Sequence, residues 1–155
     1  WKIDKYPLQI EYSGIKEKLP DKPTAKKLAS VIAKLREQKL PNPNSYPNIG
    51  SFFINPSISV KKAQLLKKKF PEMPFSVQKE NPLIKISAGW LIEKCGLKGF
   101  RSGNVGMSSE QALVLVNYGN ASSRELLQFS ESVRQQVLSV FGISLELEPT
   151  VYGSF

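Results

Sequence analysis

The spacing of hydrophobic residues predicts alternating strands and helices along most of the chain. Alternation at every second position, or a short apolar run, predicts strands over residues 7–13, 51–55, 82–86, 112–117 and 143–148. Apolar residues at helical spacing predict helices over residues 25–38, 60–69, 88–95 and 122–141. The pattern therefore indicates an α+β protein, and we expect a mixed, mostly antiparallel sheet with helices packed on it.

Each predicted helix is preceded by a residue that can cap its first turn. Thr24, Ser59 and Ser87 each carry a hydroxyl that can accept a hydrogen bond from an otherwise unpaired backbone N–H. The last helix opens with the capping-box pattern of Ser122 and Glu125 and is followed by Gly142, a typical helix-terminating residue. Pro41 ends the first helix, and the proline-rich segments 40–50 and 71–81 are predicted to be loops.

Composition favours a globular domain. The chain has 155 residues, of which 41% are hydrophobic and 23% are charged, which is ordinary for a folded protein. This length fits one domain with, at most, a short attached arm. The chain begins with Trp1 rather than methionine, so we expect it to be a piece of a longer polypeptide. No apolar run approaches the roughly 20 residues of a membrane span, and we expect no membrane partner.

Positive charge is concentrated in the first two thirds of the chain. The formal charge is +9, and residues 1–101 hold 20 lysines and arginines against 8 acidic residues. A basic half indicates an anionic partner such as a phosphate group, a nucleic acid or an anionic surface, although a solvated lysine-rich surface is the alternative. The run Lys67–Lys69 has no interleaved aromatic residues, so a solvated helix face is favoured over a nucleic-acid contact.

Several classes of chemistry are excluded by composition. The chain has no histidine, which removes histidine-based nucleophilic and metal sites, and its single cysteine, Cys95, excludes an internal disulfide and fits a reducing compartment. No Walker-type or dinucleotide-binding glycine motif is present. Taken by themselves, Ser51 at a loop–strand junction and Glu148 at a strand end are ordinary structural positions.

Three blocks of sequence resemble one enzyme family. The first is Lys39-Leu-Pro-Asn-Pro followed by Gly50-Ser-Phe-Phe-Ile-Asn-Pro56; the second is Ser87-Ala-Gly-Trp-Leu-Ile-Glu-Lys-Cys-Gly-Leu-Lys-Gly99; the third is Gln111-Ala-Leu-Val-Leu-Val-Asn117. In this order they resemble the C-terminal, substrate-binding domain of UDP-N-acetylenolpyruvoylglucosamine reductase, also called UDP-N-acetylmuramate dehydrogenase. The resemblance extends over essentially the whole chain.

The resemblance implies a flavin-dependent reduction in peptidoglycan precursor synthesis. In this family NADPH reduces FAD, and the flavin then delivers hydride to the methylene carbon of UDP-GlcNAc-enolpyruvate. A family member also has an N-terminal FAD-binding domain, which is absent from this chain. We therefore expect residues 1–155 to be the substrate-binding domain of a cytoplasmic bacterial enzyme, inactive without that N-terminal partner. The alternative is a stand-alone binding module for a nucleotide sugar or, through its lysines, for nucleic acid.

The same resemblance assigns roles to six residues. Ser51 matches the proton donor, and Glu148 matches the catalytic glutamate in an ungapped alignment that places Thr150 where the family usually has arginine. The positions that hold the UDP part of the substrate are matched by Lys39, Asn55, Lys98 and Gln111. Lysines suit a diphosphate as point charges, and amides can orient a uracil or a phosphate oxygen.

Overall fold

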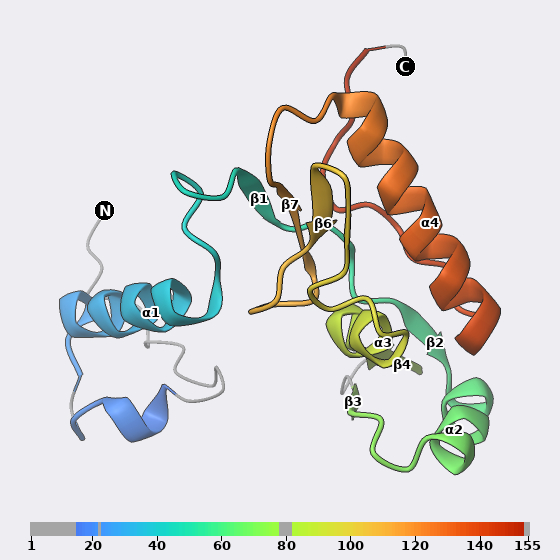
Figure 1. Cartoon of the computed structure of the whole chain (residues 1–155). Coiled ribbons are helices and arrows are strands. Elements are labelled where there is room, and N and C mark those ends of the chain that lie inside the picture. The colour runs from blue at the N-terminus through green and yellow to red at the C-terminus, as the bar shows by residue number, and fades with distance from the viewer. Residues whose placement is uncertain (1–14, 22, 78–81, 154–155) are drawn as a thin grey trace. The chain divides into compact units, whose positions relative to one another are not determined.

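The chain folds into two compact units, Trp1–Leu40 and Pro41–Phe155, which are described separately here (Figure 1). The structure is a computed structural model and describes residues 15–21, 23–77 and 82–153. Within these ranges the side chains of residues 16, 38, 39, 76 and 77 are not described. The strand predicted over residues 7–13 lies outside the described residues.

The first unit is built on the long helix α1 (Ala25–Lys39), which follows the short 3-10 helix η2 (Lys16–Lys18). Thr24 caps α1 as predicted, because its Oγ1 accepts a hydrogen bond from the backbone N–H of Lys27 at 3.2 Å. The apolar stripe of α1 buries Leu28, Val31 and Leu35 together with Ile15. This small cluster forms the core of the first unit among the described residues.

Among its described residues, the second unit contains two antiparallel sheets. The first has the strand order β1-β7-β6-β5, and the second has the order β2-β4-β3. The strands of the first are β1 (Asn48–Ser51), β7 (Val114–Asn117), β6 (Val105–Met107) and β5 (Arg101–Ser102). The strands of the second are β2 (Ser57–Ser59), β4 (Leu83–Ile86) and β3 (Phe75–Val77). The helices and antiparallel strands confirm the predicted α+β class.

The described part of the second unit also contains the helices α2 (Val60–Lys69), α3 (Ala88–Lys94) and α4 (Ser123–Phe141). Helix α4 contacts β6 and α3, and it runs beside the larger sheet in Figure 1. The predicted capping box is formed, because Ser122 and Glu125 exchange hydrogen bonds at the start of α4, and Gly142 ends the helix at a φ of 62°. No helix in the described ranges is long and apolar enough to cross a bilayer.

The core of the second unit lies where the two sheets meet the helices. Phe70, Trp90 and Phe141 form an aromatic cluster with ring-centre distances of 4.9–6.1 Å. Phe52 and Phe53 are both buried, and their rings meet edge to face at 5.4 Å. Because the Phe53 side chain is completely inaccessible, truncating it to alanine should cost about 3–5 kcal/mol.

The structure corrects two strand predictions and one loop prediction. The strand expected over 51–55 starts earlier, at Asn48, and the one expected over 143–148 reduces to an isolated bridge between Leu147 and Phe53. The segment 71–81, expected to be a loop, contributes β3. These segments pair over only one to four residues, which is too short for sequence periodicity to define their limits.

Candidate functional site

Ser51 is the last residue of β1, and its side chain is exposed. The preceding Gly50 has a φ of 81°, a left-handed conformation that glycine adopts without steric cost. The register between β1 and β7 shifts at this point, because Asn48 pairs with Val116 whereas Ser51 pairs with Val114. One extra residue on β1 therefore forms a β-bulge immediately before Ser51.

Glu148 lies on the segment that pairs with the residues following Ser51. Its backbone N–H donates to the carbonyl oxygen of Phe52 at 3.0 Å, and the N–H of Ile54 donates to the carbonyl oxygen of Glu146 at 2.9 Å. These two bonds flank the bridge between Phe53 and Leu147. Ser51 and Glu148 thus lie on adjacent hydrogen-bonded segments, and both side chains are exposed. The structure brings the two predicted catalytic residues into one region from distant parts of the chain.

Asn55 and Gln111 each lie beside the first turn of α3. The Asn55 Oδ1 accepts a hydrogen bond from the N–H of Ala88 at 2.8 Å. The Gln111 Oε1 lies against Gly89, 3.3 Å from where a Cβ on that glycine would be. Ser87 caps the helix, as predicted, by accepting from the N–H of Trp90 at 3.2 Å. A glycine at position 89 therefore leaves the room that the Gln111 side chain occupies.

Lys98 lies on the loop after α3, next to the loop that carries Gln111. The N–H of Gly99 donates to the carbonyl oxygen of Ser108 at 3.3 Å, and the Ser108 hydroxyl accepts from the N–H of Gln111 at 3.3 Å. The Lys98 Nζ is 3.3 Å from Glu93 Oε1 in an ion pair that is partly exposed on both sides. This exposed ammonium group can bind a phosphate oxygen if it moves away from, or is shared with, Glu93.

Lys39 is not brought to this region by any described contact. It is the last residue of α1, in the first unit, and its side chain is outside the described set. Its proposed role in binding the UDP group therefore stays a prediction.

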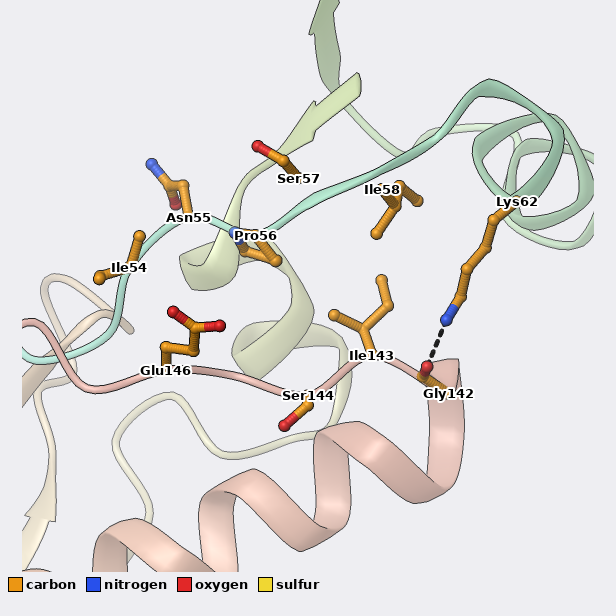
Figure 2. A pocket seen from close by; sticks show the side chains of 10 residues that line it. All are labelled: Ile54, Asn55, Pro56, Ser57, Ile58, Lys62, Gly142, Ile143, Ser144 and Glu146. Carbon is orange, nitrogen blue, oxygen red and sulfur yellow. Dashed lines mark hydrogen bonds between the residues drawn. The ribbon is translucent and has the colours of Figure 1, made fainter. Parts of the chain in front are cut away.

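An open pocket of about 360 Å³ lies between the segments 54–58 and 142–146 (Figure 2). At one end, Ile58 and Ile143 lie beside the hydrogen bond from Lys62 Nζ to the carbonyl oxygen of Gly142. Asn55 and Glu146 lie at the other end. Of the five predicted residues whose side chains the structure describes, Asn55 alone lines this pocket. Sequence reasoning did not select Glu146, although it alternates with Leu145 and Leu147 in the same register as Glu148.

Cys95, the acidic residues and the α2 lysines are the remaining candidates for chemistry that the sequence offers. Burial raises the pKa of the Cys95 thiol, so this thiol remains protonated near neutral pH. Within the described ranges, no group of three or more cysteine and acidic residues is arranged to hold a metal ion. On α2, Lys61, Lys68 and Lys69 are exposed, as expected for a solvated face, while Lys67 Nζ donates to the carbonyl oxygen of Met73 at 2.9 Å.

Comparisons with known proteins show which family the chain resembles. Residues 42–152 match the family model described as the C-terminal domain of UDP-N-acetylenolpyruvoylglucosamine reductase. A reductase of that name from Pseudomonas aeruginosa is 40% identical over 149 residues, which cover 94% of this chain and 44% of that protein. One from Flavobacterium johnsoniae is 45% identical over 129 residues, covering 83% of this chain and 38% of that protein.

Similarity to solved structures is illustrated by a reductase of the same kind. The UDP-N-acetylenolpyruvylglucosamine reductase from Thermus caldophilus aligns with a TM-score of 0.48 and 25% identity, covering 83% of this chain and 34% of that one. The chain thus spans less than half the length of the curated relatives that it matches. The family model itself covers most of the second unit, including Ser51, Asn55, Lys98, Gln111 and Glu148. The chain therefore belongs to the UDP-N-acetylenolpyruvoylglucosamine reductase family, through that family's C-terminal domain.

Proposed function

We propose that this chain is the substrate-binding domain of a bacterial, cytoplasmic reductase that converts UDP-GlcNAc-enolpyruvate to UDP-N-acetylmuramate. The observation that carries the proposal is the pairing of the Ser51 and Glu148 segments through the hydrogen bond from Glu148 N to Phe52 O. This pairing supports a site in which an exposed hydroxyl and an exposed carboxylate act on one substrate. Membership of the reductase family favours this function over a stand-alone binding module.

The described residues of this chain do not fit a flavin dinucleotide. A dinucleotide diphosphate is usually bound at the start of a helix that follows a strand and a glycine-rich turn. Helix α4 is the longest described helix, and it does follow a strand, but the Glu125 carboxylate already accepts hydrogen bonds at its start. A second anion would be repelled there. We propose that FAD, reduced by NADPH, is held by a separate N-terminal domain and supplies the hydride.

Ser51 supplies the proton in the proposed reaction. Hydride adds to the methylene carbon of the enolpyruvyl group, so the carbon–carbon double bond becomes a single bond and negative charge develops on the adjacent carbon. An aliphatic hydroxyl is a weak acid, but a carbanion next to a carboxylate is a strong enough base to take its proton when the two are held in contact. The Ser51 Oγ loses a proton to that carbon and regains one from water. We assign to Glu148 the polarisation of the enolpyruvyl group.

The UDP group of the substrate is bound, in this proposal, by residues around the start and end of α3. Asn55 keeps its Nδ2 group as a donor because its Oδ1 already accepts from Ala88. Gln111 and Lys98 lie on loops joined through Ser108 and Gly99, so they can contact neighbouring parts of one ligand. We retain Lys39 as a further phosphate ligand on the strength of the motif alone.

Substitution of Ser51 by alanine tests the proposal in the intact reductase that contains this domain. The variant should bind UDP-GlcNAc-enolpyruvate normally and accept electrons from NADPH normally. Its rate of substrate conversion should fall by at least about 100-fold, because one general acid contributes a factor of about 100 or more. The matched control is Ser139→Ala, which removes an exposed hydroxyl on α4. Unchanged substrate conversion in Ser51→Ala would remove Ser51 from the proposed role.

A further inference from the structure

Asn48 connects the loop before β1 to the bulge that precedes Ser51. Its Nδ2 donates to the carbonyl oxygens of Tyr46 at 2.8 Å and Pro41 at 3.2 Å. Its Oδ1 accepts a hydrogen bond from the N–H of Gly50 at 3.0 Å. This half-buried amide therefore uses both its donor group and its acceptor on backbone groups that lie at most seven residues away along the chain.

The bulge decides which way the end of β1 faces. The four residues of β1 from Asn48 to Ser51 lie opposite only three residues of β7, from Val116 to Val114. Side chains on a strand alternate between faces, so a shift of one residue turns every following side chain to the opposite face. Without the bulge at Gly50, the hydroxyl of Ser51 would point away from its observed side of the sheet.

Gly50 permits the bulge but does not by itself require it. Its φ of 81° is accessible to glycine, yet glycine adopts many other conformations about as readily. No heavy atom lies within 4 Å of where a Cβ on Gly50 would be, so packing does not hold this residue in place. The hydrogen bond from Gly50 N to Asn48 Oδ1 is the described side-chain contact that restrains it.

We propose that Asn48 is a positioning residue, which holds the Gly50 bulge so that the Ser51 hydroxyl is directed at the substrate. The inference rests on the proposed function, in which Ser51 is the proton donor. Asn48 does not touch the reacting atoms in this proposal, and it acts only through the backbone of Gly50. A displacement of about 1 Å at a reacting group can cost about 100-fold in rate. A flexible bulge would therefore slow the transfer of the proton from Ser51 to the substrate.

Two substitutions separate positioning from stability. Asn48→Ala removes the acceptor for Gly50 N–H and both donor contacts. Asn48→Asp keeps an oxygen for Gly50 N–H but directs a second oxygen at the carbonyl oxygens of Tyr46 and Pro41, which is repulsive. We therefore expect Asn48→Asp to be the less stable variant and Asn48→Ala to be the less well-positioned one. Asn44→Ala is the control, since Asn44 is an exposed asparagine of the same loop whose side chain makes no described hydrogen bond.

The first measurement uses the 155-residue chain without any cofactor. Amide hydrogen exchange followed by NMR should show faster exchange at Gly50 in Asn48→Ala, while exchange in Asn48→Asp and Asn44→Ala should stay close to that of the parent chain. Urea unfolding ranks the stability of the same variants. Unchanged exchange at Gly50 in Asn48→Ala would show that Asn48 does not hold the bulge, and the inference would be wrong.

The second measurement uses the intact, pre-reduced reductase in a single turnover with UDP-GlcNAc-enolpyruvate. Asn48→Ala should lower the rate of substrate conversion by about tenfold to 100-fold with little change in substrate affinity, and Asn48→Asp should retain most of the rate despite its lower stability. Conversion that instead follows the order of stability would assign Asn48 a structural role only and refute the inference. If Ser51→Ala converts substrate at the parental rate, the proposed function fails as well; if Ser51→Ala is slow and Asn48→Ala is not, only the positioning role fails.

Discussion

Replacing Asn55 separates its structural hydrogen bond from its proposed contact with the UDP group. The Asn55 Oδ1 accepts from the N–H of Ala88 at 2.8 Å, and Ala88 is fully buried. Asn55→Ala would leave that buried amide without its acceptor, which costs about 1–3 kcal/mol. For a chain of this length, about 2 kcal/mol corresponds to a fall of about 4–8 °C in the melting temperature.

Asn55→Asp should behave differently. A carboxylate keeps an acceptor for Ala88 N–H, so we expect the free energy of unfolding to stay within about 0.5 kcal/mol of the parent value. The same substitution replaces the Nδ2 donor by a negatively charged oxygen, which repels a diphosphate. We therefore expect the Kd for UDP-N-acetylglucosamine to rise by about tenfold or more, the equivalent of about 1.4 kcal/mol.

Two assays on the 155-residue chain test these expectations. Urea unfolding followed by the fluorescence of Trp90 and Trp1 measures stability, and titration calorimetry measures the binding of UDP-N-acetylglucosamine. Asn120→Asp is the control for added charge, because Asn120 is exposed and its side chain makes no described hydrogen bond. An Asn55→Ala variant as stable as the parent would refute the argument from the buried amide. An Asn55→Asp variant that binds as tightly as the parent would remove Asn55 from the UDP site.

Three further predictions concern stability, pH and binding. Gly106→Ala would place a Cβ 2.7 Å from a backbone carbonyl oxygen, whereas at Gly103 a Cβ meets open space and the cost is only that of a left-handed φ of 58°, about 1–2 kcal/mol. Urea unfolding should therefore show a larger loss of stability for Gly106→Ala than for Gly103→Ala. Equal losses of stability would contradict this geometry. Hydrogen bonds from the backbone and side chain of Ser122 lower the pKa of Glu125 from its ordinary value of 4.5. The stabilisation by this carboxylate is therefore present above pH 4.5 and is lost as the pH falls below it. We expect the melting temperature of Glu125→Gln to decline less steeply than that of the parent below about pH 4.5. A decline as steep as the parent's would count against a stabilising role for the charged capping box. Lys98→Ala breaks only a surface ion pair worth less than about 1 kcal/mol, so the free energy of unfolding should change little. Calorimetry should show that the variant binds UDP-N-acetylglucosamine more weakly and with less dependence on salt. Unchanged affinity would exclude Lys98 from the site.

Local signals in the sequence predicted the helices well. Ser59, Ser87 and Ser122 each cap the helix assigned to them, because a cap depends on residues three positions apart. The two-residue strand β5 was not predicted, since so short a strand depends on its partner β6 rather than on its own pattern. The ends of the helices are therefore determined by residues close in sequence, whereas the ends of the strands depend on pairing with residues far away in sequence.

In the candidate site, too, local motifs predicted individual residues, whereas their contacts with distant segments could not be predicted from the sequence. Motifs selected Ser51 and Glu148, but no local pattern indicated that the N–H of Glu148 binds the carbonyl oxygen of Phe52. The bulge at Gly50 was also beyond sequence reasoning, because it is defined by the register of β1 against β7. Asn48 was missed for the same reason, since its importance comes from a backbone conformation that only the folded sheet reveals.

The segment from Asn48 to Ile54 changes partners along its length, pairing first with β7 and then with residues 146–148. This change of partner has a consequence for synthesis on the ribosome. Ser51 leaves the exit tunnel well before residues 146–148, which form the second partner of its segment. A nascent chain can complete its first helices while this half of the site is still missing, so binding of the nucleotide sugar would report the arrival of the C-terminal segment.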